Sequence, residues 1–196
     1  MPREDALRWN ARYTQDDRFS TFTRPRPFLV EQSHWLPESG LALDVAMGLG
    51  GNAEFLMGRG LRVVGVDISW VALRQAKRRL PELMVFQADL PRINLADGVF
   101  DVILNFYYLQ RDLWASFRRW LRPGGILIFE TLTREMLDIQ PDTDPAYLLE
   151  SGELYTAFKD METLVYREKR VMGRGGRPCA VASLVARRPF VVTPPV

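Results

Sequence analysis

The stretch LDVAMGLGGN, residues 43–52, places an aspartate beside a run of residues that carry almost no side chains. Asp44 lies at the end of an apolar run, and Gly48, Gly50 and Gly51 follow within seven residues. A plain tight turn needs about one glycine, whereas several bare positions let the backbone come close to something large. The stretch therefore predicts a strand, then a loop that approaches a ligand, then a helix.

Further apolar runs alternate with helical patterns along the chain, and this alternation is typical of a parallel sheet covered by helices. The runs are nearly continuous, which indicates strands buried on both faces. Helices are expected after Ser69, a suitable N-cap, and over 111–121, which ends at RPGG (122–125). The expected strands are LALDVA (41–46), RVVGVD (62–67), LMVFQAD (83–89), FDVILNF (100–106) and GILIFE (125–130).

The two ends of the chain have different patterns. The segments 162–170 and 179–188 alternate as strands do, and the glycine-rich GRGGR (173–177) between them predicts a hairpin that ends the sheet with an antiparallel strand. Two segments before residue 41 are expected to be helical, 3–13 and 26–36. The chain has no internal repeat and no linker, so we expect a single domain over residues 1–196.

Composition excludes several classes of protein. The net charge of +2 is too small to indicate nucleic-acid binding, and the single Cys179 excludes an internal disulfide and fits a reducing compartment. One cysteine and one histidine, His34, provide no zinc cluster. The polar N-terminus does not look like a signal peptide, and no apolar run could span a bilayer. We therefore expect a soluble cytoplasmic protein without a metal, a nucleic-acid partner or a membrane partner.

The glycine loop is compatible with two kinds of ligand. Gly48, Gly50 and Ala53 fit the dinucleotide fingerprint G-x-G-x-x-G/A, and Asp67 follows Gly48 by 67 − 48 = 19 residues, close to the offset of a ribose-binding acid. Asp44 argues against a dinucleotide, because a carboxylate beside the loop would repel a pyrophosphate and attract a cationic group. Asp89, in QADL, could accept a hydrogen bond from the amino group of adenine.

Five segments in order resemble the motifs of class I S-adenosylmethionine-dependent methyltransferases. The resemblance covers about residues 40 to 187 and implies a Rossmann-like α/β fold, a seven-stranded mixed sheet of order 3-2-1-4-5-7-6 whose strand 7 is antiparallel, with helices on both faces. It also implies S-adenosyl-L-methionine as the cofactor, a helical lid over residues 1–38 and a core over 40–190. The five segments are LDVAMGLGGN (43–52), VVGVDIS (63–69), QADL (87–90), FDVILNFYYL (100–109) and LRPGGILIFET (121–131).

Three shorter features are similar to the small tellurite-resistance-type methyltransferases. They are a W-x-x-R-Y element from Trp9 to Tyr13, the stretch NFYYLQR (105–111), and P-x-x-L-L-x-x-x-E-L from Pro145 to Leu154. The sequence departs from the motif of the wider class at Ala46, where the first glycine is usual, and at Met47. We expect the loop to form, and the cofactor still to bind, if Ala46 lies in the β region, because alanine disfavours positive φ.

The resemblance also implies which residues hold the cofactor. Asp44 would meet the amino group, Asp67 the ribose hydroxyls, and Asp89 with Leu90 the adenine edge. Arg12 would meet the carboxylate of the cofactor or an anionic acceptor. The full set of cofactor-site candidates is Asp44, Ala46, Gly48, Gly50, Asn52, Asp67, Ile68, Asp89, Leu90, Asn105, Phe106 and Arg12.

The acceptor is less well defined by the sequence. Tyr107, Tyr108 and Arg111 are candidates for its pocket, and several arginines, Arg24 and Arg26 among them, could favour an anion. No pair of residues stands out as a general base, which suits in-line transfer to a small molecule that needs none. Two alternatives stay open: a protein that binds the nucleoside without catalysis, and a nicotinamide-dependent oxidoreductase.

Overall fold

The computed structural model describes residues 2–15, 22–173 and 176–190, and in it seven strands form one mixed sheet. The order is β3-β2-β1-β4-β5-β7-β6, and β7 runs antiparallel to both of its neighbours. The order expected from the resemblance is therefore confirmed. The strands are β1 (Gly40–Val45), β2 (Leu61–Asp67), β3 (Met84–Gln87), β4 (Phe100–Phe106), β5 (Leu121–Leu132), β6 (Glu162–Met172) and β7 (Pro178–Arg187).

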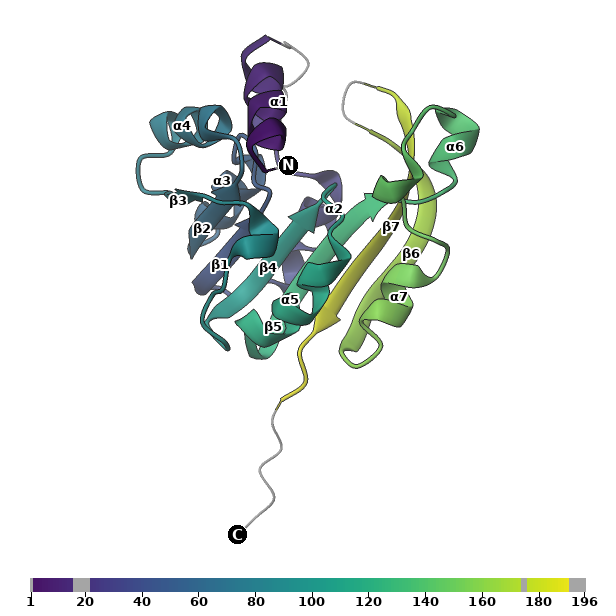
Figure 1. Cartoon of the computed structure of the whole chain (residues 1–196). Helices are drawn as coiled ribbons and strands as arrows, with labels where there is room; N and C mark the ends of the chain where they lie inside the picture. Colours follow the sequence, from purple (N-terminus) through teal and green to yellow (C-terminus); the bar gives the residue numbers. More distant parts are fainter. Residues whose placement is uncertain (1, 16–21, 174–175, 191–196) are drawn as a thin grey trace.

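Helices cover both faces of the sheet, as Figure 1 shows. Side chains alternate along each strand, so Leu43 and Val45 of β1 pack on one face whereas Ala42 packs on the other. The first face is covered mainly by α5 and α7, and the second by α2, α3 and α4. The helices are α1 (Pro2–Gln15), α2 (Pro27–Glu31), α3 (Gly51–Met57), α4 (Trp70–Arg79), α5 (Trp114–Trp120), α6 (Met136–Ile139) and α7 (Glu153–Ala157).

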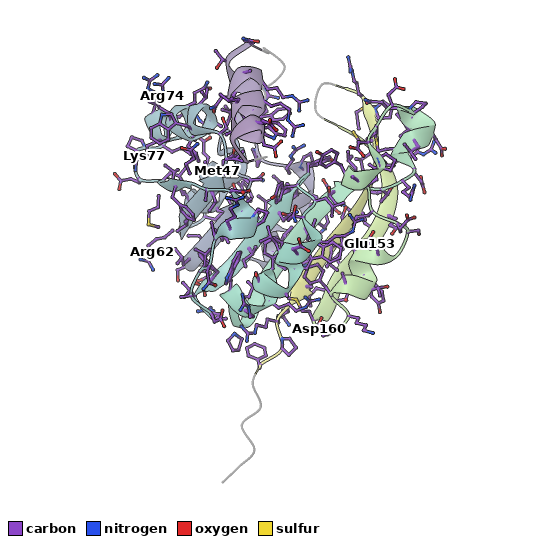
Figure 2. The ribbon with its side chains drawn as sticks, viewed as in Figure 1. Met47, Arg62, Arg74, Lys77, Glu153 and Asp160 are labelled. Carbon is purple, nitrogen blue, oxygen red and sulfur yellow. The ribbon has the colours of Figure 1, made fainter. Side chains whose placement is uncertain are left out.

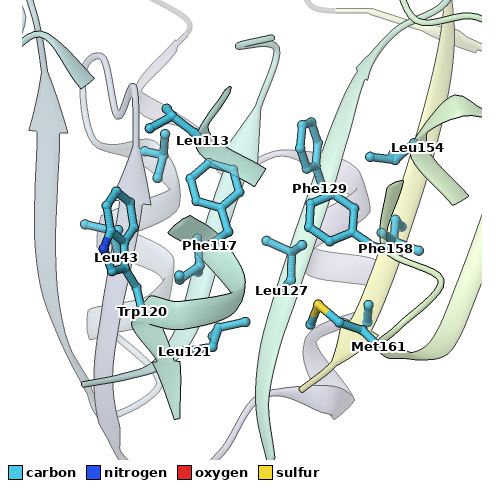
Figure 3. Packing of buried hydrophobic residues seen from close by; sticks show 14 of the residues in the cluster. Leu43, Leu113, Phe117, Trp120, Leu121, Leu127, Phe129, Leu154, Phe158 and Met161 are labelled. Atoms are coloured by element: carbon cyan, nitrogen blue, oxygen red, sulfur yellow. The ribbon is translucent and has the colours of Figure 1, made fainter. Parts of the chain in front are cut away.

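Aromatic rings fill the core between the sheet and α5 (Figure 3). Phe117 and Trp120 of α5 are fully buried, and the ring of Phe117 meets that of Phe129 on β5 edge to face, with 6.3 Å between centroids. Phe129 in turn meets Phe158, at 6.1 Å. This cluster fixes α5 against β4 and β5, and so fixes the direction in which the segments after these two strands leave the sheet.

The expected elements are confirmed, and several of their boundaries differ. The helix expected over 111–121 is a 3₁₀ turn, Arg111–Leu113, followed by α5, and the strand expected over 83–89 is the shorter β3. The helix expected over 26–36 is broken into α2 and a short 3₁₀ turn, Ser33–Trp35. The last strand of the parallel set, β5, begins at Leu121 rather than 125, because Leu121 pairs with Phe100 before the register shifts so that Ile126 pairs with Val102. The RPG residues in between form an irregularity at the edge of that pairing.

Charged side chains lie mainly on the outer surfaces of the helices. Arg74 and Lys77 of α4 are both exposed (Figure 2), and Lys77 donates to the carbonyl oxygen of Leu83, before β3, at 2.8 Å. The run KRR (77–79) therefore lies on a helix surface and offers no enclosed site. Within the described residues, no helix is long and apolar enough to cross a membrane.

Candidate functional site

A cavity of about 670 Å³ lies at the carboxyl ends of the parallel strands. In Figure 1 this is the upper edge of the sheet, where α1 stands above β1 and β4. Open α/β sheets bind ligands at this edge. Asp44, Asp67 and Asp89 all line the cavity, so the three acids that follow neighbouring strands converge on one space.

Asp67 connects the glycine loop to the next helix. Its Oδ2 atom accepts the backbone N–H of Gly48 at 2.7 Å, and its Oδ1 atom accepts that of Ser69 at 2.8 Å. Ser69 is the N-cap of α4, as expected, and its hydroxyl accepts the N–H of Ala72. Burial raises the pKa of the Asp67 carboxyl above its usual value. Each carboxylate oxygen has a second lone pair, so these bonds leave Asp67 able to accept from a ligand.

The backbone conformation of Ala46 differs from the one expected from the sequence. Its φ is 51°, in the left-handed region and not in the β region. The loop forms nevertheless, and alanine there carries the strain that a glycine would avoid. Met47 follows with its thioether packed against Gly65 of β2 and close to Gly50, which makes it a core residue of the loop. Figure 2 shows Met47 below α1.

The three glycines of the loop have different structural roles. Gly48 lines the cavity, and a Cβ there would lie 2.6 Å from the Tyr13 hydroxyl. Gly51 also lines it, and a Cβ there would lie 2.4 Å from the carbonyl oxygen of Arg24. Gly50, in contrast, caps α3 with φ 75° and does not line the cavity. Gly51 therefore admits the chain's own backbone at Arg24, and the close approach to a ligand that was expected at Gly50 is available at Gly48.

Most of the remaining candidates from the sequence lie on the wall. Asn52 also accepts the N–H of Arg26 with its Oδ1 atom at 2.9 Å, and this bond fixes the chain that crosses the start of α3. Asp89 forms an ion pair with Arg92 at 3.1 Å, which leaves the second oxygen of its carboxylate for another donor. The candidates that line the cavity are Arg12, Asp44, Ala46, Gly48, Asn52, Asp67, Ile68, Asp89, Leu90, Phe106, Tyr107 and Tyr108.

Two other candidates lie behind the wall. Asn105 is 1% exposed, and its Nδ2 atom donates to the carbonyl oxygen of Tyr108 at 2.7 Å, so it shapes the turn after β4. Arg111 points away and forms a two-bond ion pair with Glu153, at 2.5 and 2.9 Å. That hydrogen bonding lowers the pKa of Glu153. Arg111 thus joins NFYYLQR to the later segment 145–154, whose Tyr147 does line the cavity.

The first helix closes the cavity from above. The Oδ1 atom of Asn10 accepts the Ser69 hydroxyl at 2.8 Å and the N–H of Val71 at 3.2 Å. Gln75 of α4 donates to the carbonyl oxygen of Tyr13 at 3.2 Å. Together with the contact between Tyr13 and Gly48, these bonds hold α1 over the glycine loop and α4.

A cluster of polar residues on the other side of the cavity was only partly visible in the sequence. The guanidinium of Arg26 lies over the ring of Tyr107, 4.0 Å from its centroid. Glu130, at the end of β5, is 5% exposed and accepts the hydroxyl of Ser183 at 2.8 Å. Burial raises the pKa of the Glu130 carboxyl. A single acid inside the apolar run GILIFE was the available signal for Glu130.

The residues around the loop fit a nucleoside without a pyrophosphate. The Gly48 N–H donates to the Asp67 carboxylate, so this donor of the loop is not open to a phosphate. Asp44, 1% exposed, places a carboxylate beside the same loop. A buried carboxylate at this place disfavours a phosphate and favours a cationic group. Among the residues that the structure describes, no three His, Cys, Asp or Glu side chains lie as metal ligands would.

Comparison with known proteins points to one family. Residues 43–129 match a family described as a methyltransferase domain. YqeM of Bacillus subtilis, named as a methyltransferase, is 31% identical over 121 residues, which are 55% of this chain and 49% of that protein. The malonyl-[acyl-carrier protein] O-methyltransferase of Enterobacter lignolyticus is 33% identical over 100 residues, 48% of this chain and 40% of that one. The chain thus spans about half the length of the curated relatives it matches.

The fold has a close match among solved structures. TehB from Haemophilus influenzae superposes with a TM-score of 0.73 over 92% of this chain and 67% of TehB, at 15% sequence identity. Identity this low shows a shared fold and no more. The sheet order, the domain match and the methyltransferase relatives agree with one another. Over residues 43–129 the chain is therefore similar to a methyltransferase domain, and its sheet has the order that the resemblance to class I S-adenosylmethionine-dependent methyltransferases implies.

Proposed function

We propose that this protein transfers a methyl group from S-adenosylmethionine to a small-molecule acceptor. The observation that carries the proposal is that one cavity extends over the ends of five strands. Near the ends of β1, β2 and β3 it is lined by Asp44, Asp67 and Asp89. Near the ends of β4 and β5 it is lined by Tyr107 and Thr131. Such a cavity has room for a nucleoside beside a second molecule.

In this proposal each aspartate binds one part of the cofactor. Asp44, beside the bare backbone at Gly48, attracts the cationic methionine end through its charge. Asp67 accepts from the ribose hydroxyls with the lone pairs that Gly48 and Ser69 leave over. Asp89 accepts from the adenine amino group, and Ile68 and Leu90 supply apolar contact to the ring.

The N-terminal segment would act as a lid over residues 1–38. Trp9, Arg12 and Tyr13 line the cavity from above, and Asn10 holds α1 against α4. A helix in this position excludes water from the cavity, which strengthens the electrostatic contacts inside it. We place the cofactor carboxylate near Arg12, because this exposed guanidinium is carried by the lid itself.

Methyl transfer requires the residues around the acceptor mainly to position it. When bound, S-adenosylmethionine supplies a methyl group on a sulfonium, which is a good leaving group for an in-line displacement. The residues after β4 then have to orient the acceptor and keep water out. Phe106 and Tyr107 can form that surface, since both lie on the cavity wall.

Two other functions remain as alternatives. A protein that binds the nucleoside without catalysis would keep the acidic part of the cavity and show no methyl transfer. A nicotinamide-dependent oxidoreductase is disfavoured because the buried carboxylate of Asp44 lies beside the loop and would repel a pyrophosphate. The single cysteine of the chain supports a reducing compartment such as the cytoplasm as its location.

A methyl-release assay separates these functions. The purified chain is incubated with labelled S-adenosylmethionine and a panel of thiols, phenols, amines and carboxylic acids. Formation of S-adenosylhomocysteine that depends on one acceptor, and that Asp67→Asn lowers, supports the proposal. Asp97→Asn is the matched control, because Asp97 is an exposed aspartate away from the cavity. Binding of S-adenosylhomocysteine without turnover on any acceptor favours the non-catalytic alternative, and absence of binding contradicts both.

A further inference from the structure

Arg26 presents a fixed cation to the part of the cavity that follows β4 and β5. Its guanidinium is stacked on Tyr107 at 4.0 Å, and the ring of Phe22 lies 5.5 Å away. Its backbone N–H is bound by Asn52 at 2.9 Å. All four residues line the cavity. Stacking between rings orients a guanidinium plane and leaves its edge, which carries the N–H donors, open to a ligand.

The charge of Arg26 has no direct partner in the part of the chain that the structure describes. No carboxylate there lies within ion-pair distance, and the guanidinium makes no hydrogen bond. Glu130 acts on it only through longer-range electrostatics, and the Glu130 carboxylate accepts the Ser183 hydroxyl at 2.8 Å. Burial lowers the pKa of Arg26. A cation that is partly removed from water without a partner destabilises the fold, and a ligand anion would offset that cost.

The backbone of Tyr107 supports the same conclusion. Tyr107 has a φ of 58°, an unusual value for an aromatic residue, and its N–H donates to the carbonyl oxygen of Glu130 at 2.8 Å. This conformation holds the ring beneath the Arg26 guanidinium. Backbone strain of this kind persists where the surrounding structure enforces it, and it gathers at ligand sites.

We propose that Arg26 is an oxyanion-binding residue of the acceptor pocket, so that the methyl acceptor carries a carboxylate or a comparable anionic group. The inference rests on the proposed function and adds the class of acceptor. The position in the sheet favours the acceptor over the cofactor as the source of the anion. Arg26 packs on residues that follow β4 and precede the end of β5, whereas the three aspartates follow β1, β2 and β3.

The test uses matched acid and amide probes on the protein saturated with S-adenosylhomocysteine. The pairs are benzoate and benzamide, indole-3-acetate and indole-3-acetamide, and hexanoate and hexanamide, with binding followed by ligand-observed NMR. We expect at least one acid to bind the wild-type protein about tenfold tighter than its amide, as charge-assisted bonds to arginine allow. Arg26→Gln should abolish that preference.

Two further variants serve as controls. Arg24→Gln is the control for charge, since Arg24 is exposed in the same segment and does not line the cavity; it should keep the preference for acids. Arg26→Lys keeps the charge without the planar fork and should retain part of it. Circular dichroism of each variant shows whether it is folded.

Three results would overturn the proposal. The first is that no acid binds better than its amide, and the second is that Arg26→Gln keeps the preference. The third is that Arg26→Gln weakens S-adenosylhomocysteine about tenfold or more while leaving methylthioadenosine, which lacks the carboxylate, unchanged; the anion would then belong to the cofactor. If the wild-type protein binds no S-adenosylhomocysteine at all, the proposed function fails first, which is a different outcome.

Discussion

The carboxylate of Asp67 accepts the backbone N–H of Gly48 at 2.7 Å, across 19 residues of sequence. The bond joins the end of β2 to the glycine loop that follows β1. It makes the acid part of the loop, and the lone pairs that remain on the carboxylate face the cavity. One contact thus shapes the loop and leaves the same carboxylate able to bind a ligand.

Asp67→Asn tests this double role. Gly48 and Ser69 donate to different oxygens of Asp67, and a carboxamide replaces one of these oxygens with an NH2 group that cannot accept, so one N–H loses its partner. We expect the affinity for S-adenosylhomocysteine, measured by calorimetry, to fall about tenfold or more. Asp97→Asn should leave it within about twofold. Equal affinities for Asp67→Asn and the wild-type protein would show that Asp67 neither orders the loop nor touches the ligand.

Ala46→Gly should stabilise the protein. Alanine in the left-handed region costs about 1–2 kcal/mol, and the extra freedom of glycine in the unfolded chain offsets about 0.5–1 kcal/mol of the gain. The free energy of unfolding, from urea titration, should therefore rise by about 0.5–1 kcal/mol. Ala53→Gly, inside α3, is the matched control and should lower it by about 1 kcal/mol. A loss of stability in Ala46→Gly would contradict the strain inferred from its φ of 51°.

Glu130→Gln should change how stability depends on pH. Burial raises the pKa of this carboxyl above its ordinary value of 4.5, so the folded state holds the proton more tightly than the unfolded chain does. The resulting stabilisation is complete below pH 4.5 and is lost as the pH rises through the raised pKa.

Glutamine does not titrate, so Glu130→Gln should lack this decline. Urea midpoints between about pH 4 and pH 8 would show the variant gaining on the wild-type protein as the pH increases. Glu82→Gln, at an exposed position, should follow the wild-type curve. If the curves of Glu130→Gln and wild type stay parallel, burial does not raise the pKa of Glu130.

Asn10→Ala should loosen the lid. The variant loses both acceptor contacts to the start of α4, at 2.8 and 3.2 Å, while the sheet keeps its core. Dissociation of S-adenosylhomocysteine, followed by stopped flow, should become about three- to tenfold faster, since two hydrogen bonds of ordinary strength hold the helix. Gln15→Ala, exposed at the end of α1, should dissociate at the wild-type rate. A wild-type rate for Asn10→Ala would mean that α1 does not control release.

Much of the fold could be predicted because buried strands appear in the sequence as apolar runs. The runs at 41–46 and 100–106 are apolar on both faces because helices cover both sides of the sheet. The boundary of β5 could not be predicted, because Leu121 joins the sheet through its pairing with Phe100. Register depends on partners that a single run does not reveal.

The site, like the fold, could be predicted only in part. Acids after successive parallel strands must meet at one edge, so Asp44, Asp67 and Asp89 could be expected to line one cavity. Arg111 was a reasonable candidate for the acceptor pocket, yet Glu153, 42 residues later, binds it behind the wall. Arg26 gave no more signal than other arginines, because its stacking on Tyr107 arises only from the folded chain.

Calorimetric titration of the wild-type chain with S-adenosylhomocysteine, and separately with NADH, tests the central claim most directly. An adenosyl site built from three carboxylates, with the Gly48 N–H already bound, predicts a single site for S-adenosylhomocysteine with a micromolar dissociation constant. It predicts no measurable heat with NADH. Heat with NADH and none with S-adenosylhomocysteine would contradict the account.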